Sequence, residues 1–248
     1  MPERFRIIAL AMAAVFICYI DRVVISLTII PMGEELGWSN TEKGIVLGSF
    51  YIAYMVTQIY GGILSDRIGA KIILGVGLIT WSLFTLVTPL AAAAGFTILI
   101  LARLGMGLGE GVTFPAWHSL YARWIPKSER SRAVAATNSA IPLGTIFGLV
   151  VTPIIIIELS WQWAFYLYGA IGFVWYIFWS KYVSSSPTES STISHKELTY
   201  ITDNAPASGP GEDLDWRIWF FNRPLWAIAV AHFCNNYTLN KNTFSLGN

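Results

Sequence analysis

Residues 62–71 read Gly-Ile-Leu-Ser-Asp-Arg-Ile-Gly-Ala-Lys, a short polar loop between two long apolar stretches. Two of its glycines, Gly62 and Gly69, allow a pair of helices to turn tightly. Asp66 lies shortly before the second apolar stretch, where a carboxylate is stabilised by the positive end of a helix dipole. The loop therefore predicts two membrane helices that turn at one face of a membrane.

Apolar stretches of similar length repeat on both sides of this loop. Hydrophobic residues make up 54% of the 248 residues and charged residues 12%, and the mean hydropathy is +0.55. A typical soluble domain has about 25% charged residues. Six stretches are close to the roughly 20 residues that a helix needs to cross a bilayer: 7–30, 44–64, 72–92, 96–121, 133–157 and 163–183. Because a backbone in lipid must satisfy its own hydrogen bonds, the predicted fold class is an all-α membrane protein with a six-helix bundle.

The chain divides into three predicted parts. Residues 1–183 form the six-helix bundle. Residues 184–223 are rich in Ser, Thr, Pro and Gly and are expected to be a cytoplasmic linker. Residues 224–248 begin with a seventh apolar stretch, 224–237, which is too short to cross the hydrocarbon core comfortably. We interpret this part as the incomplete start of a seventh helix with a truncated or aberrant tail; a naturally short chain is the alternative.

Basic residues are distributed unevenly between the loops. With the N-terminus in the cytoplasm, the cytoplasmic side carries Arg4, Arg6, Arg67, Lys71, Arg123, Lys127, Arg130, Arg132, Lys181, Lys196, Arg217 and Arg223. The outer loops between the six spans contain a single base, Lys43, and acidic residues dominate there. This distribution follows the positive-inside rule and predicts a multi-pass protein in a lipid bilayer with a cytoplasmic N-terminus.

Charge and reactive residues exclude several classes of protein. A net charge of +1 gives no basic surface for a nucleic-acid partner. The sequence contains no metal-ligand cluster or nucleophile constellation, so we expect neither an enzyme nor a cofactor. The number of apolar stretches suggests a seven-helix receptor as an alternative, but the seventh stretch lacks the lysine that a retinal protein needs, with none before Lys241. Cys18 and Cys234 lie in apolar stretches and are expected to pack rather than to form a disulfide.

Four ionisable residues lie inside predicted spans: Asp21, Arg22, Arg103 and Glu110. Such residues are costly in lipid and usually face a cavity or pair with one another. Arg103 and Glu110 are seven positions apart, which places them on one face of a helix, about 10 Å apart along its axis. Asp21 and Arg22 differ by about 100° around their helix, so we expect one to face a cavity and the other to brace a neighbouring helix.

This set of charges suits the transport of an anion. Arginine binds carboxylates through paired hydrogen bonds, which makes Arg22 and Arg103 candidates for anion binding. A carboxyl group in a poorly hydrated site can take up and release a proton, which makes Asp21 and Glu110 candidates for coupling. The charged helices are the first of two successive triplets, and an inverted three-plus-three repeat would bring them together at the bilayer midplane. The alternative is that all four residues only form buried ion pairs that hold the helices together.

The loop at 62–71 resembles the G-x-L-[AS]-D-[RK]-x-G-[RK]-[RK] sequence between the second and third helices of the major facilitator superfamily. The resemblance implies a cytoplasmic gate motif formed by Gly62, Asp66, Arg67 and Gly69. Ala70 replaces a basic residue that is usual in the family, which puts the strength of this gate in doubt. An ordinary positively charged loop is the alternative interpretation.

Residues 103–116 read RLGMGLGEGVTFPA. With Tyr19-x-Asp21-Arg22, they resemble the anion:cation symporter family within that superfamily, which includes sialin, vesicular glutamate transporters, plant anion transporters and bacterial sugar-acid symporters. The resemblance runs to about Thr238 and implies the N-terminal half of a secondary active transporter. It would move an organic anion such as a sugar acid, or phosphate, with protons or sodium, by alternating access against a missing six-helix C-terminal half. An inactive fragment is the alternative.

The resemblance also implies roles for individual residues. Arg22 is expected to contact the substrate anion, helped by Tyr19 and Tyr54. Arg103 is expected to interact with Glu110 on the same helix face. The implied sites of proton or cation coupling are Asp21 and Glu110.

Leu47 departs from part of the family. The vesicular glutamate members carry a histidine where Leu47 stands, and the short outer loop at 31–43 has no glycosylation sequon. We therefore expect a bacterial or organellar member, and a bacterial inner membrane as its location.

Overall fold

The computed structural model describes residues 2–204, 222–224, 226–227, 230–231 and 234. The chain separates into two units, Met1–Ala205 and Pro206–Asn248. Only short helical pieces of the second unit are described. The end of the predicted linker and most of the predicted seventh stretch therefore lie outside the described residues.

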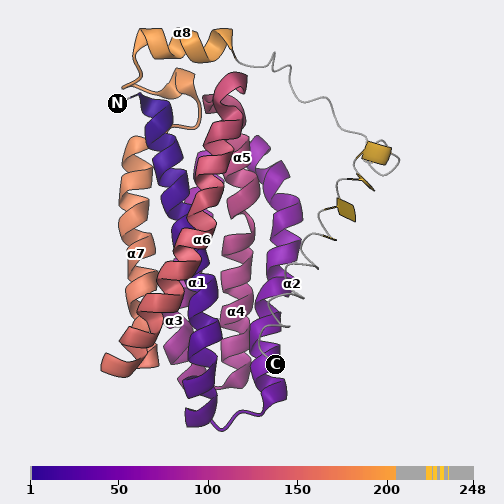
Figure 1. Cartoon of the computed structure of the whole chain (residues 1–248), viewed down its shortest axis with the longest axis vertical. Helices are drawn as coiled ribbons and strands as arrows, with labels where there is room; N and C mark the ends of the chain where they lie inside the picture. Colours follow the sequence, from indigo (N-terminus) through magenta and orange to yellow (C-terminus); the bar gives the residue numbers. More distant parts are fainter. Residues whose placement is uncertain (1, 205–221, 225, 228–229, 232–233, 235–248) are drawn as a thin grey trace. The chain divides into compact units, whose positions relative to one another are not determined.

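The first unit is a bundle of long helices that run up and down (Figure 1). Its helices are α1 (Glu3–Glu35), α2 (Asn40–Leu64), α3 (Ala70–Ala94), α4 (Phe96–Gly111), α5 (Thr113–Trp124), α6 (Lys127–Glu158) and α7 (Trp161–Tyr182). No strand occurs among the described residues. Each of the six predicted spans corresponds to one of these helices, with α4 and α5 together forming the fourth. The predicted all-α six-helix bundle is confirmed.

Four continuous helical stretches in the described part are long and apolar enough to cross a membrane: Glu3–Glu35, Asn40–Ala94, Phe96–Trp124 and Lys127–Glu158. The second of these contains both α2 and α3, because a π-helical turn, Ser65–Gly69, joins them without a break. Helix α7 is not among the four, since its many Trp and Tyr residues lower its hydropathy. Such residues are enriched at membrane–water interfaces.

The fourth span is interrupted at Val112, where the sequence predicts one helix. Pro115 lies three positions later; it has no N–H, and its ring would clash with the carbonyl of Gly111 in a continuous helix. The helix resumes at Thr113, since the N–H of Ala116 bonds to the Val112 carbonyl at 3.0 Å. The result is an irregularity of one residue, Val112, between α4 and α5, two positions after Glu110.

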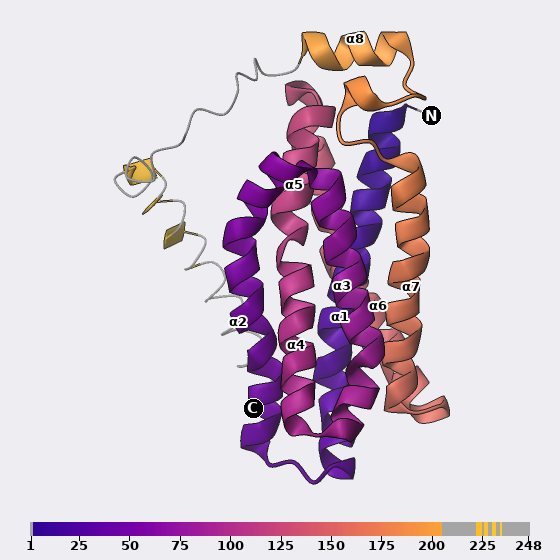
Figure 2. The same ribbon diagram turned by 180° about the vertical axis from the view of Figure 1, so that it is seen from behind.

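Glycines allow α4 to lie between α2 and α3 (Figure 2). A Cβ atom added to Gly107 would come within 3.1 Å of the backbone nitrogen of Tyr54 in α2. One added to Gly109 would come within 2.7 Å of the carbonyl oxygen of Gly77 in α3. Both neighbours are backbone atoms, so neither position tolerates a side chain without moving a helix. Glu110 belongs to the remaining face of α4.

The two ends of the bundle differ in charge. The N-terminus, the turn between α2 and α3, the end of α5 and helix α8 (His195–Asp203) lie together at one end (Figure 1). This end carries the bases predicted to be cytoplasmic in residues 2–204, whereas Lys43 lies in the first turn of α2 at the opposite end. We call the first the basic end.

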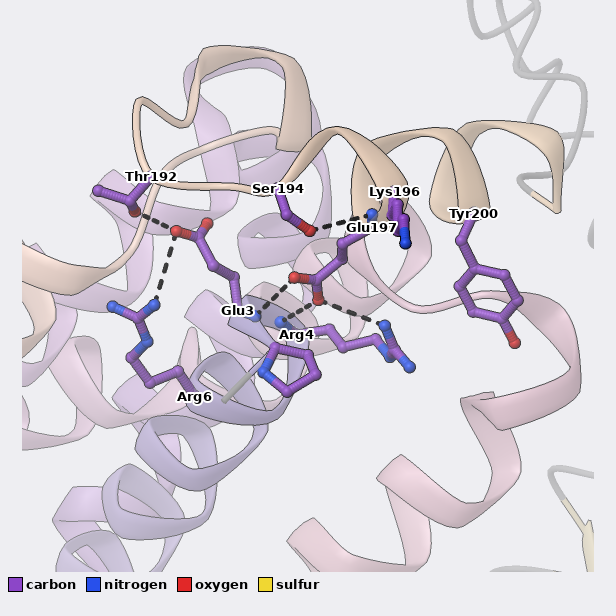
Figure 3. Close-up of a pocket in the computed structure, with 9 residues that line it drawn as sticks. Glu3, Arg4, Arg6, Thr192, Ser194, Lys196, Glu197 and Tyr200 are labelled. Carbon is purple, nitrogen blue, oxygen red and sulfur yellow. Dashed lines mark hydrogen bonds and ion pairs between the residues drawn. The ribbon is translucent and has the colours of Figure 1, made fainter.

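Helix α8 is tied to the start of α1 (Figure 3). The carboxylate of Glu197 accepts the backbone N–H groups of Glu3, at 2.9 Å, and Arg4, at 3.1 Å. It also accepts the Arg4 guanidinium at 3.3 Å. The first N–H groups of a helix have no partner within it, so Glu197 supplies a cap for α1 from a distant part of the chain.

Other contacts bind the same segment to the bundle. Glu3 accepts hydroxyl groups of Ser190, at 2.6 Å, and Thr192. Arg4 also pairs with Glu129 at 2.9 Å, near the start of α6. We call residues 184–203 the strap, because they cross the basic end of the bundle. Beneath the strap lies a cavity of about 520 Å³.

Candidate anion and proton site

The predicted charged residues meet midway along the bundle, between α1 and α4. These two helices are not among the closely packed pairs of the described bundle, in which α1 packs on α6 and α7 and α4 packs on α2 and α3. Side chains fill the space between them. Those of the predicted site are Tyr19, Asp21, Arg22, Tyr54, Arg103 and Glu110.

An ion pair between Arg22 Nε and Glu110 Oε1 connects the two helices. Glu110 is completely buried, while 19% of the Arg22 side chain is exposed. The atoms Arg22 Nη2 and Glu110 Oε2 are buried without a hydrogen-bond partner among the described residues. A buried charge needs both a partner and satisfied hydrogen bonds. The pair is therefore only partly satisfied, and each member keeps one polar atom for another ligand.

Two tyrosines flank the guanidinium of Arg22. Its central carbon lies 4.9 Å from the centroid of the Tyr19 ring and 4.6 Å from that of Tyr54. Aromatic faces attract cations at this distance. The close approach of α6 supports Tyr19, since a Cβ atom on Gly144 would lie 3.2 Å from the Cβ of Tyr19. Both rings therefore help to hold the guanidinium of Arg22 in this position.

A cavity of about 200 Å³ adjoins the ion pair. It is lined by Asp21, Arg22, Ile25, Ser26, Leu47, Phe50, Tyr51, Arg103 and Met106. The structure thus differs from the expectation that only one of Asp21 and Arg22 would face a cavity. The reason is that the long arginine side chain extends around the helix, so that both residues reach the same space.

Asp21 is the charged residue of the site whose side-chain polar atoms all lack a hydrogen-bond partner among the described residues. It is completely buried, and neither of its carboxylate oxygens has a hydrogen-bond partner within residues 2–204. It interacts electrostatically with Glu110 and Arg103. The indole N–H of Trp81 in α3 lies nearby but does not satisfy hydrogen-bond geometry. Both oxygens of this carboxylate therefore keep their capacity to bind a proton or a cation.

Arg103 interacts electrostatically with Glu110 but forms no ion pair with it among the described residues. Its Nη1 lies 3.0 Å from the sulfur of Met106, and its guanidinium lies 5.0 Å from the centroid of the Phe50 ring. The two residues share a helix face, as predicted, but two helical turns separate them, and the ion pair of Glu110 is formed with Arg22 instead.

Phe50 and Cys18 belong to the site but were missed in the sequence. Phe50 lies between the two arginines, 5.9 Å from the guanidinium of Arg22, and stacks on Tyr54. The thiol of Cys18 lies 3.0 Å from Glu110 Oε1. Each stands four positions before a predicted site residue, on the same helix face, and this spacing was the available signal.

The predicted gate motif forms the π-helical turn between α2 and α3. Asp66 accepts the hydroxyl of Ser119 at 2.6 Å, and its backbone carbonyl accepts Arg123 at 3.2 Å. Its carboxylate therefore bonds to α5 and does not cap α3, whose N-cap position is Gly69. The sequence did not indicate this bond to α5, because Ser119 lies 53 positions away.

The glycines and the arginine of this motif have different surroundings. Gly69 has φ +112°, a conformation that residues with a Cβ rarely adopt. Gly62 has open space around it, with Pro115 at 3.9 Å, whereas the neighbouring Gly61 would clash with Pro115 at 3.0 Å. Arg67 is exposed. The tight contact between α2 and α5 thus depends on Gly61, which the sequence analysis did not single out.

Known proteins resemble this chain along almost its whole length. A probable anion transporter 4, chloroplastic, from Oryza sativa subsp. japonica is 39% identical over 95% of the chain and 40% of its own length. The chloroplastic ascorbate transporter of Arabidopsis thaliana is 37% identical over 95% of the chain and 44% of its own length. Human sialin is 39% identical over 83% of the chain and 42% of its own length. The chain spans less than half the length of each of these relatives.

Solved structures show the same fold. The xylose transporter XylE from E. coli, in an inward open conformation, matches with a TM-score of 0.67 at 16% identity, over 81% of this chain and 56% of its own. A bacterial homologue of the human lysosomal transporter Spinster matches with a TM-score of 0.66 at 19% identity, over 77% of this chain and 45% of its own.

These findings decide between the classes that the sequence left open. The relatives are transporters by name, which agrees with the predicted anion transporter family and excludes the receptor and enzyme classes. They come from plants and animals, so they give no support to the expected bacterial inner membrane. The family model described as Major Facilitator Superfamily matches residues 11–244. The chain belongs to the major facilitator superfamily and is a membrane protein.

Proposed function

We propose that this chain forms the first half of a secondary active transporter for an organic anion or phosphate, coupled to protons or sodium. The observation that carries the proposal is the buried ion pair of Arg22 and Glu110, which leaves one nitrogen and one oxygen without partners in the described part of the chain. Two Arabidopsis relatives are named for ascorbate and for sodium-dependent phosphate, which supports an anionic substrate.

Arg22 alternates between Glu110 and the substrate. When Glu110 takes up a proton, it loses its charge and its Coulomb attraction for Arg22. The guanidinium then binds the anion through two parallel N–H bonds, which its free Nη2 allows. When the anion leaves, Glu110 releases the proton and the ion pair forms again. A buried charge without a partner is costly, so the proton and the anion move together.

Asp21 provides a second site for the coupling ion. Asp21 lines the same cavity as Arg22 and Arg103, and both of its oxygens lack a hydrogen-bond partner in the described part of the chain. Attraction by Arg103 favours the charged form of this carboxylate, whereas burial and repulsion by Glu110 oppose it. Bound substrate competes for Arg103. Anion binding at Arg103 therefore changes how readily Asp21 holds a proton or a sodium ion.

Tyr19 and Tyr54 give the exchange its direction. Their ring centroids lie 4.9 Å and 4.6 Å from the central carbon of the guanidinium, so both rings hold it close to Glu110 and the cavity. The turn at 62–71, with Asp66 bonded to Ser119, acts as the cytoplasmic gate by holding the ends of α2 and α5 together. Alternating access then requires movement of this bundle against a second six-helix bundle.

Uptake measurements require a second half, because the relatives are about twice as long as this chain. We define the fused transporter as this chain joined to the C-terminal half of the Arabidopsis sodium-dependent phosphate transport protein 1, which is 39% identical over the matched region. In proteoliposomes the fused transporter should accumulate labelled phosphate. A fusion that inserts correctly and transports nothing, beside an active parent protein, would contradict the proposal.

Substitution of Arg22 tests the site itself. Arg22→Ala in the fused transporter should lower phosphate uptake by at least about 30-fold, since it truncates one partner of a buried charge pair. Arg132→Ala removes an exposed arginine and serves as the control. Normal uptake by Arg22→Ala would remove Arg22 from the substrate site.

Glu110→Gln separates coupling from binding. The neutral amide should abolish accumulation against a gradient but leave exchange of internal for external phosphate, because Arg22 is free to bind the anion. Imposed proton and sodium gradients, tested separately, identify the coupling ion. Glu158→Gln, at an exposed position, is the control. Accumulation that persists in Glu110→Gln would assign coupling to another residue.

A further inference from the structure

A buried thiol contacts the same carboxylate oxygen as Arg22. Cys18 lies one helical turn before Arg22 on α1, and its sulfur is 3.0 Å from Glu110 Oε1. The side chain is completely buried. A thiol is a weak hydrogen-bond donor without charge, so this contact orients the carboxylate and does not neutralise it.

The two donors leave the carboxylate of Glu110 asymmetric. Oε1 accepts both the thiol of Cys18 and the Nε–H of Arg22, whereas Oε2 is buried and accepts no hydrogen bond in the described structure. A proton can therefore bind to Oε2 without breaking either contact. Of the two donors, Arg22 moves in the proposed exchange, whereas Cys18 is packed among the core side chains of the bundle.

We propose that Cys18 is a positioning residue, which holds the Glu110 carboxyl group in place while Arg22 moves from Glu110 to the substrate anion. The inference rests on the proposed function, because it concerns a step of the proposed exchange. With Cys18 bonded to Oε1, the protonated Glu110 keeps its orientation. Arg22 can then pair with the same oxygen again when the anion has left. Without the thiol, the protonated side chain is free to turn away.

Packing alone is the competing explanation for Cys18, which lies among apolar side chains of the bundle core. The two explanations differ in what replaces the thiol. If Cys18 only fills space, Cys18→Ser should be no better than Cys18→Ala, because a buried hydroxyl adds a polar group to the core. If Cys18 is a donor, Cys18→Ser should restore what Cys18→Ala removes.

Infrared spectroscopy of the thiol tests the contact on the chain as it exists, in lipid nanodiscs. The sequence has two cysteines, so Cys234→Ser leaves Cys18 as the single S–H group. Its stretching band should lie at the lower frequency of a hydrogen-bonded thiol, and it should move toward the free-thiol frequency in Glu110→Gln. Arg22→Gln should leave the band hydrogen-bonded, because the thiol contact is independent of the arginine. Cys18→Ser should remove the band and so identify it.

A band at the free-thiol frequency in Cys234→Ser alone would overturn the proposal, whether or not the Glu110 variant folds. So would a band that Glu110→Gln does not move. In the fused transporter, Cys18→Ala should lower proton- or sodium-driven uptake about fivefold, as expected for one lost hydrogen bond, and Cys18→Ser should restore it. Equal uptake by the two variants contradicts positioning, whereas normal uptake by Arg22→Ala contradicts the proposed function.

Discussion

The carboxylate of Glu197 accepts the backbone N–H of Glu3 at 2.9 Å, although 194 positions separate the two residues. Only 8% of Glu197 is exposed. Helix α8 itself begins with a local cap, in which Ser194 accepts the backbone N–H of Glu197 at 3.2 Å. The cap of α8 therefore orients the residue that caps α1.

Glu197→Ala should destabilise the start of α1 and release the strap. The loss of a helix cap costs about 0.5–2 kcal/mol, and here the guanidinium of Arg4 also loses a partner. We expect faster amide hydrogen exchange in residues 3–6 and in α8, measured by mass spectrometry on the chain in nanodiscs. Glu189→Ala, an exposed acid in the same strap, is the matched control. Equal exchange in both variants would contradict the capping role.

Gly107→Ala should weaken the packing of α4 on α2. The added methyl group meets the backbone of α2, 3.1 Å from the Tyr54 nitrogen, and overpacking of this kind costs about 1–3 kcal/mol. Thermal unfolding in detergent, followed by circular dichroism, measures the change.

Gly48→Ala is the control for that experiment, since nothing lies within 4 Å of the position that its Cβ would occupy. It should leave stability unchanged or raise it by up to about 1 kcal/mol, because alanine favours helix. If both alanine variants unfold at the same temperature as the parent chain, close helix contact at Gly107 is not needed.

Gly69→Ala should strain the turn between α2 and α3, whereas Gly62→Ala should not. Gly69 has φ +112°, and an alanine held in such a conformation costs about 1–3 kcal/mol. Gly62 is helical and its nearest contact lies at 3.9 Å. Thermal unfolding of both variants shows whether glycine is needed for its backbone conformation, as expected at Gly69, or only for its small size. A larger loss in Gly62→Ala would reverse this assignment.

Arg22→Lys should fail as a conservative replacement in the fused transporter. A lysine keeps the charge but lacks the planar fork that donates two parallel bonds and that contacts the rings of Tyr19 and Tyr54. We expect phosphate uptake to fall about tenfold, with normal insertion. Uptake equal to that of the parent fusion would mean that charge alone suffices.

Helix positions were predictable because they depend on local chemistry. The stretch predicted at 7–30 is α1, Glu3–Glu35, and the stretch at 133–157 is α6, Lys127–Glu158. In both cases the observed helix is longer at each end. Hydropathy identifies only the part that lipid can surround, and polar turns continue the hydrogen-bonded helix beyond it.

Contacts between side chains of different helices were less predictable from the sequence. Spacing placed Arg103 and Glu110 on one face, but it could not tell which neighbouring side chain would reach Glu110 first. That depends on how α1 lies relative to α4, which is a matter of tertiary packing and not of spacing within one helix. The roles of Arg22, Asp21 and Glu110 in transport stay predictions until uptake is measured.

The strap had no local signal in the sequence. Its residues fall within the predicted linker, 184–223, and α8 (His195–Asp203) lies among them. Its partner is the backbone of Glu3 and Arg4, and backbone groups leave no trace in a pattern of side chains.

The strap also sets an order for biogenesis. Helix α1 is the first helix of this chain to leave the ribosome, yet the residue that caps it is synthesised after all six spans. During synthesis the leading N–H groups of α1 must therefore be satisfied by water or by lipid headgroups. The cap of α1 forms only after position 197 has been synthesised, so a nascent chain stopped before this position has an inserted α1 that lacks the cap.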